Sequence, residues 1–206
     1  MTENKKENLN NRMIKFLFEG APVRGACVQM AEEWQEMIKF HHYPENVAAL
    51  LGQFTAGALL LSSTIKFEGS LILQVKGSGP IAFIYAEVRN PMSVRAMAEI
   101  REGAEIKPEM DLQELINKDG KGLCALILDP KDRRPGVQPY QGMVSLESNS
   151  VAENLENYMA KSEQLETKLY LAADCKKLGG LVIQKMPSVG GNVSEISDPD
   201  AWGRIM

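Results

Sequence analysis

The sequence has few of the side chains that carry most enzymatic and metal chemistry. Its 206 residues include two histidines and three cysteines. The cysteines lie far apart, without the C-x-x-C pairs that make a zinc site easy to build, at Cys27, Cys124 and Cys175. His41 and His42 are adjacent at a predicted helix end, where both cannot easily bind one ion. We therefore expect no catalytic residue, no metal and no cofactor in this chain.

The cysteines also carry information about the compartment. An odd number of cysteines without local pairs argues against a disulfide framework and is typical of a reducing compartment. Cys124 and Cys175 lie in strand-like runs, LCALIL and LAADC. A cysteine in such a run is usually a small buried hydrophobic residue, so we predict that both are buried.

A basic excess is also absent. The chain has 23 Lys and Arg residues against 27 Asp and Glu residues, which gives a net charge of −4. This balance argues against a phosphate-binding surface, so we expect no nucleic acid partner. The one basic cluster, Lys131, Arg133 and Arg134, includes an aspartate and precedes a Pro-Gly pair. We interpret it as a solvated turn.

No segment predicts a membrane span or a secretory signal. The most apolar stretch begins at Val47, but Gln53, Thr55 and Ser62 interrupt it. It is far shorter than the roughly 20 consecutive apolar residues that a span needs. The first residues, MTENKKENLNNR, are polar and lack the apolar core of a signal peptide. We therefore predict a cytoplasmic protein without a membrane partner, and a disordered tail over residues 1–12.

The strongest structural signal is a change of period between residues 47 and 80. Apolar residues first recur at helical spacing, at Val47, Leu50, Leu51, Phe54, Ala58 and Leu61. Most residues between them are also apolar or small, which predicts a helix that is buried on all sides. From Leu71 onward, apolar residues alternate with their neighbours at the period of a strand.

A glycine-rich string follows this strand. Residues 77–82, GSGPIA, fit the G-x-G-x-x-A pattern of dinucleotide-binding turns, which must open a helix. Residues 81–88 instead alternate at period two, and Pro80 has no amide N–H to offer a phosphate. We predict a hairpin turn here.

The remaining pattern predicts an α+β fold, with a mixed, largely antiparallel sheet packed with the long buried helix and a second amphipathic helix. The second helix begins after Ser150, and Glu153 would complete a capping box. Shorter helices are predicted over residues 32–41 and 111–117. Strands are predicted over residues 13–19, 23–30, 70–76, 81–88, 94–101, 122–128, 140–146, 168–173 and 180–186.

Five ordered motifs carry a family resemblance. They are FLFEGAPVRG (16–25), LLGQFTAGALLLSSTIKFEGSLILQVKGSGP (50–80), QPYQGMVSLE (138–147), SVAENLENYMAKSEQLETKLYLAA (150–173) and GGLVIQKMP (179–187). Together they resemble the redox-regulated thirty-three-kilodalton heat-shock chaperone family. The resemblance covers residues 13–187, which we expect to form the core domain. It implies an ATP-independent holdase that dimerises and carries a zinc-linked thiol switch in a C-terminal domain with clustered cysteines.

That switch domain has no counterpart in these 206 residues. Residues 188–206 are predicted to be a linker and the start of a truncated helix, signalled by Asp198-Pro199. The helix signal runs out at Met206, so we expect an engineered or proteolysed core rather than a natural short form. The zinc ligands of the family are missing here, and neither zinc nor the redox switch is assigned to any residue.

Several predicted strands carry apolar residues on both faces. The 11 methionines against six phenylalanines favour adaptable contacts of the kind that promiscuous binding surfaces use. We predict a client-binding surface at Phe83, Tyr85, Met97, Met143 and Met186. The alternative is that helices cover both sides of the sheet and make these five residues ordinary core.

The favoured function is therefore a holdase that binds unfolding proteins through apolar surface and forms a homodimer. Two alternatives stay open. Convergent polar groups in a cleft would support a small-molecule-binding domain or an enzyme on the same sheet. A structural subunit would bind one specific partner and ignore unfolded proteins.

Overall fold

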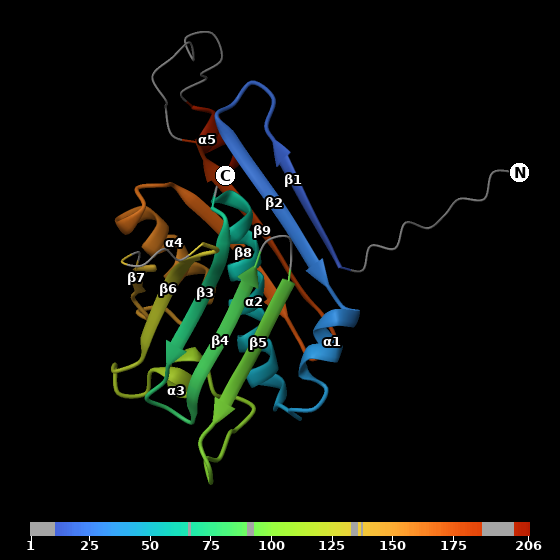
Figure 1. The fold of residues 1–206 in the computed structure, drawn as a ribbon, viewed down its shortest axis with the longest axis vertical. Helices are drawn as coiled ribbons and strands as arrows, with labels where there is room; N and C mark the ends of the chain where they lie inside the picture. Colours follow the sequence, from blue (N-terminus) through green and yellow to red (C-terminus); the bar gives the residue numbers. More distant parts are fainter. Residues whose placement is uncertain (1–10, 66, 90–92, 133–135, 137, 187–199) are drawn as a thin grey trace, which may run out of the picture.

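Two antiparallel sheets form the frame of the molecule (Figure 1). The computed structural model describes residues 11–65, 67–89, 93–132, 136, 138–186 and 200–206, and the following statements concern these residues. Sheet A has the strand order β1 (Arg12–Leu17), β2 (Val23–Met30), β9 (Leu178–Lys185) and β8 (Thr167–Ala173). Sheet B has the order β5 (Ser93–Ile100), β4 (Ile81–Arg89), β3 (Gly69–Lys76), β6 (Leu123–Pro130) and β7 (Tyr140–Val144).

Helices pack against both sheets. They are α1 (Glu32–Ile38), α2 (Glu45–Thr64), α3 (Leu112–Ile116), α4 (Val151–Ser162) and α5 (Ala201–Ile205). Helix α2 contacts strands of both sheets and lies behind β3 and β4 in Figure 1. Helix α4 packs on β7, an edge strand of sheet B, and on β8, an edge strand of sheet A, and so connects the two sheets.

Helix α2 is the centre of the core, as its all-round apolar pattern predicts. Fourteen of its 20 residues are buried. A Cβ at Gly57 would lie 2.7 Å from Leu155 of α4, so this position allows the close approach of the two helices. By length and composition α2 could also cross a membrane, but 78% of its most apolar window is buried inside the fold. It occupies the place of a core helix between two layers.

The predicted α+β class and antiparallel pairing are confirmed, but the strands form two sheets where one was predicted. An alternating pattern shows which face of a strand is apolar and does not show which strands pair. A helix that is apolar on all sides needs a layer on each side, and two sheets supply them. Every strand pair that the structure describes is antiparallel.

The turn at residues 77–82 is a hairpin, as predicted. The Gly77 N–H donates to the carbonyl oxygen of Ala82 at 2.9 Å, and β3 then pairs antiparallel with β4. The carbonyl oxygens of Ile81 and Glu114 lie where a Cβ would sit at Gly77 and Gly79. The glycines therefore serve close backbone packing.

The capping box predicted for α4 is half right. The Ser150 Oγ accepts a hydrogen bond from the Glu153 N–H at 3.3 Å, so Ser150 is the N-cap. The Glu153 carboxylate, however, accepts from the Ser148 hydroxyl, and the Ser150 N–H donates to Ser148 Oγ at 3.0 Å. The Glu153 carboxylate is therefore bonded to the Ser148 hydroxyl and not to the Ser150 N–H, which is the donor that the capping-box pattern predicts.

One cysteine prediction is confirmed and one is wrong. Cys124 is fully buried in β6, and this burial raises the pKa of its thiol to about 12. Cys175 is exposed, because β8 ends at Ala173 and the chain turns. The Asp174 carboxylate accepts hydrogen bonds from the N–H groups of residues 176 and 177 at 2.7 and 2.8 Å and so builds that turn.

Several predicted features lie wholly or partly outside the described residues. These are most of the polar tail, the linker over residues 188–199, the Asp198-Pro199 helix start and most of the basic cluster. The short helix that follows, α5, has Asp200 as its N-cap.

Candidate functional site

Four of the five predicted client-binding residues lie on one face of sheet B. In the pairing register, Met97 of β5 is opposite Tyr85 of β4, and Tyr85 is opposite Gln74 of β3. Gln74 is opposite Ala125 of β6, which is opposite Met143 of β7. These five residues form a continuous row across all five strands, here called the Met97–Met143 row.

The row lies on the face of sheet B that points away from α2, here called the outer face. Residues that alternate with the row are buried against the core, among them Leu73, Ile84 and Leu126. Met97 and Met143 are 39% and 53% exposed. No helix among the described residues covers this face, which lies in front of α2 in Figure 1. The alternative of helices on both sides of the sheet therefore does not hold for the described part of sheet B.

Further apolar residues extend the row on both sides. Phe83 lies two residues from Tyr85 on β4, and their rings stack with centroids 6.3 Å apart. Leu123, 54% exposed, follows on β6 opposite Lys76. On the other side of the row, Ile72 and Ile127 are paired between β3 and β6. The outer face thus carries an apolar platform several residues wide, which Gln74 and Lys76 of β3 interrupt.

The sequence analysis missed Leu123, Ile72 and Ile127. Strand β6 reads LCALILDP, a nearly continuous apolar run without alternation. Such a run does not reveal which residues point to which face. Only the register with β3 assigns Leu123 and Ile127 to the outer face.

A polar cluster borders the platform on β4. Glu87 is only 7% exposed although it points to the outer face. The hydroxyl of Tyr85 and the guanidinium of Arg89 donate to its carboxylate at 3.2 and 3.1 Å. Burial alone would raise the pKa of Glu87, but hydrogen bonds from Ser70, Tyr85 and Arg89 together lower it. The carboxylate is therefore charged and satisfied, and its ion pair with Arg89 forms a polar border beside the row.

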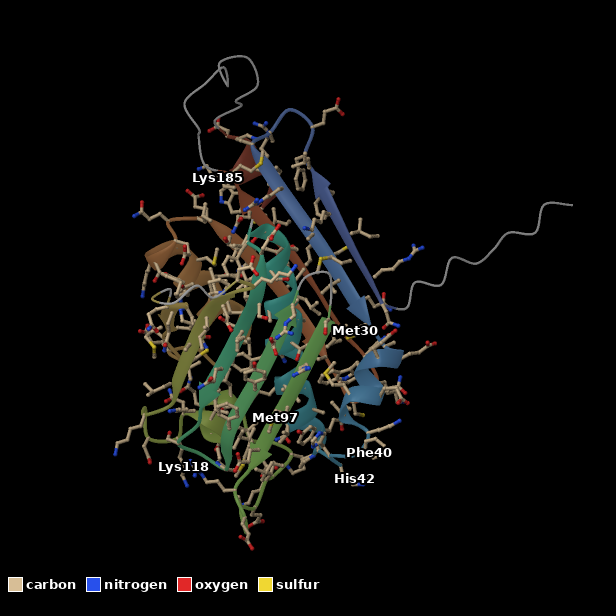
Figure 2. All side chains as sticks on the ribbon, in the orientation of Figure 1. Met30, Phe40, His42, Met97, Lys118 and Lys185 are labelled. Carbon is tan, nitrogen blue, oxygen red and sulfur yellow. The ribbon has the colours of Figure 1, made fainter. Side chains whose placement is uncertain are left out.

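Met186 does not join the other four predicted residues. It follows Lys185, the last residue of β9 in sheet A, and its N–H donates to the carbonyl oxygen of Pro22 at 2.7 Å. Figure 2 shows Lys185 at one end of the molecule and Met97 well away from it, on sheet B. The Met186 side chain is half-buried.

The motif residues Tyr140 and Glu163, far apart in sequence, meet at the end of α4. The Tyr158 hydroxyl donates to the Glu163 carboxylate at 2.8 Å, and the Tyr140 hydroxyl reaches the same oxygen at 3.1 Å. Burial, then the hydrogen bonds with Tyr140 and Glu163, raises the pKa of Tyr158. The Tyr158 hydroxyl also fills the space above Gly142. The cluster therefore joins β7 to α4.

The described residues also offer no evident metal site. The three cysteines lie apart, with Cys27 on β2 in sheet A, Cys124 buried in sheet B and Cys175 in the β8–β9 turn. No group of three or more His, Cys, Asp or Glu side chains in the described ranges could hold an ion. These residues therefore do not fit the zinc that the family resemblance implies for the C-terminal domain.

Comparison with known proteins decides the family. The family model described as Hsp33 protein matches residues 11–201. The chain belongs to the Hsp33 family. The match includes both sheets and the helices from α1 to α4.

Curated relatives of this chain carry the name 33 kDa chaperonin. The protein from Methylobacillus flagellatus is 36% identical over 96% of this chain and 64% of its own length. The Neisseria gonorrhoeae protein is 39% identical over 96% of this chain and 62% of its own length. The chain therefore spans a little under two thirds of the length of these relatives.

A solved structure supports the fold. The 33 kDa chaperonin of Thermotoga maritima superposes with a TM-score of 0.68 over 86% of this chain and 62% of its own chain. The sequence identity is 21%, so this likeness concerns the fold alone.

Proposed function

We propose that this chain is the core of an ATP-independent holdase, which binds unfolding proteins through the outer face of sheet B. The observation that carries the proposal is the Met97–Met143 row, which crosses five strands without a covering helix among the described residues and has an exposed methionine at each end. Family membership supports a chaperone role.

The chemistry of this face suits unfolded chains of many sequences. Burial of apolar surface contributes about 25 cal/mol per Å² before ordering costs, whatever the sequence that covers it. Methionines at both ends of the row can change rotamer and fit different side chains. Arg89 and the exposed Arg95 on the same face keep the empty platform hydrated at one edge.

The compartment, the assembly and the absence of catalysis belong to the same proposal. Three cysteines without a disulfide suit the cytoplasm. We expect no catalysis, because the polar groups that converge in the described residues are already bonded to each other, as in the Tyr140–Tyr158–Glu163 cluster. The protein is expected to act as a homodimer, without nucleic acid or membrane partners.

Substitution of the exposed methionines tests the proposal. Met97→Gln and Met143→Gln replace apolar contacts with amides that must stay hydrated, at a cost of roughly 1–2 kcal/mol of client burial each. The double variant should suppress the aggregation of a heat-unfolded test protein much less well, as measured by light scattering. Its own melting temperature should change by no more than roughly 2 °C, because both side chains are already exposed.

A matched control is available on the other sheet. Tyr170 of β8 is 52% exposed, close to the 53% of Met143, but lies on sheet A. Tyr170→Gln should leave suppression unchanged. If the methionine double variant melts clearly lower and suppresses aggregation normally, the two methionines are core residues and the site is wrong.

A further inference from the structure

The outer edges of the two sheets differ in how they are protected. A free strand edge exposes backbone N–H and C=O groups that can pair with another chain. On β5, the Tyr43 hydroxyl accepts from the Ala98 N–H and donates to the Ala98 carbonyl oxygen, both at 2.9 Å. On β8, the Glu156 carboxylate accepts from the Leu169 N–H at 2.7 Å. Side chains therefore occupy both of these edges.

Within the described ranges, no side chain protects the edge of β1 in this way. The Phe18 N–H donates to the Val23 carbonyl oxygen at 3.0 Å, which sets the phase of the β1–β2 ladder. Because bonded pairs alternate in an antiparallel ladder, Met13, Lys15 and Leu17 direct their N–H and C=O groups away from β2. Among the described residues, none of these outward groups has a hydrogen-bond partner.

The strand that carries this edge is firmly held. Phe16 is opposite Gly25 of β2, and its ring lies over that glycine where a Cβ would sit. The ring fixes the register of β1 on the far face of the sheet. Strand β1 is thus a fixed six-residue strand, and Met13, Lys15 and Leu17 direct their backbone groups outward from it.

An apolar cleft of about 500 Å³ opens beside the same edge. Met13 and Lys15 form one wall, because their side chains alternate to the inner face of sheet A. The other walls are the end of α2 and the ends of three strands of sheet B, at Ile65, Leu71, Val88 and Leu128. A strand added to β1 would place every second side chain next to this cleft.

The positive charge of Lys15, at the centre of β1, determines which kind of segment can pair with this edge. Lys15 has no ion-pair partner among the residues that the structure describes. If a second copy paired antiparallel about this centre, Lys15 would face the same lysine of the other chain, which is unfavourable. A carboxylate opposite Lys15, with apolar residues two positions away on each side, fits instead. Glu68 lines the cleft as well and disfavours further acidic residues inside it.

We propose that the edge of β1 binds an extended segment of a partner protein as an added strand. The segment carries a carboxylate opposite Lys15 and apolar side chains at the flanking positions, next to the cleft. This site is separate from the outer face of sheet B and uses backbone hydrogen bonds in place of a flat apolar contact. It therefore adds a second, sequence-selective mode of binding that does not depend on the proposed platform.

A labelled peptide tests the proposal directly. The probe is a fluorescein-labelled heptapeptide of sequence TVTETVT, with TVTKTVT as its charge-reversed control, and binding is followed by fluorescence anisotropy. The wild-type chain should bind the glutamate peptide at least about tenfold more tightly than the lysine peptide, a difference of about 1.4 kcal/mol. The variant Lys15→Glu should reverse this order.

A second variant removes a backbone donor from the edge of β1 and is tested with the same glutamate peptide. Lys15→Pro removes an outward N–H and leaves the ladder to β2 intact, so the protein should keep its fold by circular dichroism. It should lose binding of TVTETVT by roughly tenfold or more. Met97→Gln should bind the peptide as the wild type does.

Three results overturn the proposal. The first is absence of peptide binding to the wild type at millimolar concentration, and the second is equal affinity for both peptides in the wild type and in Lys15→Glu. The third is loss of self-association in Lys15→Pro, measured by sedimentation, without peptide binding to the wild type, because the occupant is then a second copy. If Lys15→Pro fails to fold, the charge reversal in Lys15→Glu decides the outcome.

Discussion

The Tyr43 hydroxyl that occupies the edge of β5 has a consequence for both stability and association. Tyr43→Phe removes one oxygen and keeps the ring, which stacks on His41 with centroids 5.0 Å apart. Two hydrogen bonds to Ala98 are lost. The change therefore isolates the contribution of the hydroxyl from that of aromatic packing.

The size of the effect follows from these two bonds. Each contributes about 1 kcal/mol net, so the free energy of unfolding should fall by about 2 kcal/mol. For a domain of this size that corresponds to a decrease of roughly 4–8 °C in melting temperature. The burial of this hydroxyl, which raises the pKa of Tyr43, indicates that water replaces the lost bonds only in part.

Chemical denaturation measures the change in the free energy of unfolding, and sedimentation at rising protein concentration measures the change in self-association. Tyr43→Phe should unfold at a lower denaturant midpoint and self-associate more than the wild type, because the Ala98 backbone groups become available. Tyr170→Phe, at an exposed position, serves as the control. An unchanged midpoint together with unchanged sedimentation would refute the idea that this hydroxyl protects the edge.

Three further predictions concern oxidation, acid and assembly. Peroxide should leave aggregation suppression by this chain unchanged, and replacement of Cys27, Cys124 and Cys175 by serine should alter stability only; a peroxide-dependent gain that the triple variant loses would contradict this. The pKa of Glu87 is lower in the folded protein than its ordinary value of 4.5, so the charged carboxylate stabilises the fold at pH values above 4.5. This stabilisation is lost as the pH falls through the folded-state pKa. Denaturation curves of Glu87→Gln should therefore show a weaker loss of stability below about pH 4.5 than those of the wild type, and parallel curves would exclude the effect. Sedimentation should show a concentration-dependent dimer that weakens when residues 188–206 are deleted; a strict monomer at high concentration would oppose dimerisation, whereas an unaffected dimer would remove only the exchange of that segment.

Much of the fold could be predicted because its local signals are strong. The all-round apolar pattern of α2, the Ser150 cap and the alternation in β3 to β5 each depend on residues close in sequence. The division into two sheets could not be predicted in this way, since strand pairing depends on contacts between distant segments. The exposure of Cys175 was missed because the run LAADC does not reveal the short Asx turn at Asp174, which follows the end of β8 at Ala173 and places Cys175 outside the strand.

The candidate site shows the same division. Alternation along β5 is enough to group Met97 with Ser93, Arg95 and Glu99, and the pairing register assigns this group to the outer face. Leu123 on β6 was missed, because a continuous apolar run hides its direction. The edge of β1 was also missed, since the sequence shows a strand but not which of its backbone groups stay unpaired.

Photo-crosslinking to a client gives the most direct test of the outer face as the binding surface. Benzoylphenylalanine at position 97 or 143 would lie on the Met97–Met143 row, and the same residue at position 170 would lie on sheet A, at least about as exposed as at the two row positions. With chemically unfolded α-lactalbumin present, irradiation should give abundant adducts from positions 97 and 143 and few from position 170. Equal or stronger adducts from position 170 would contradict the account.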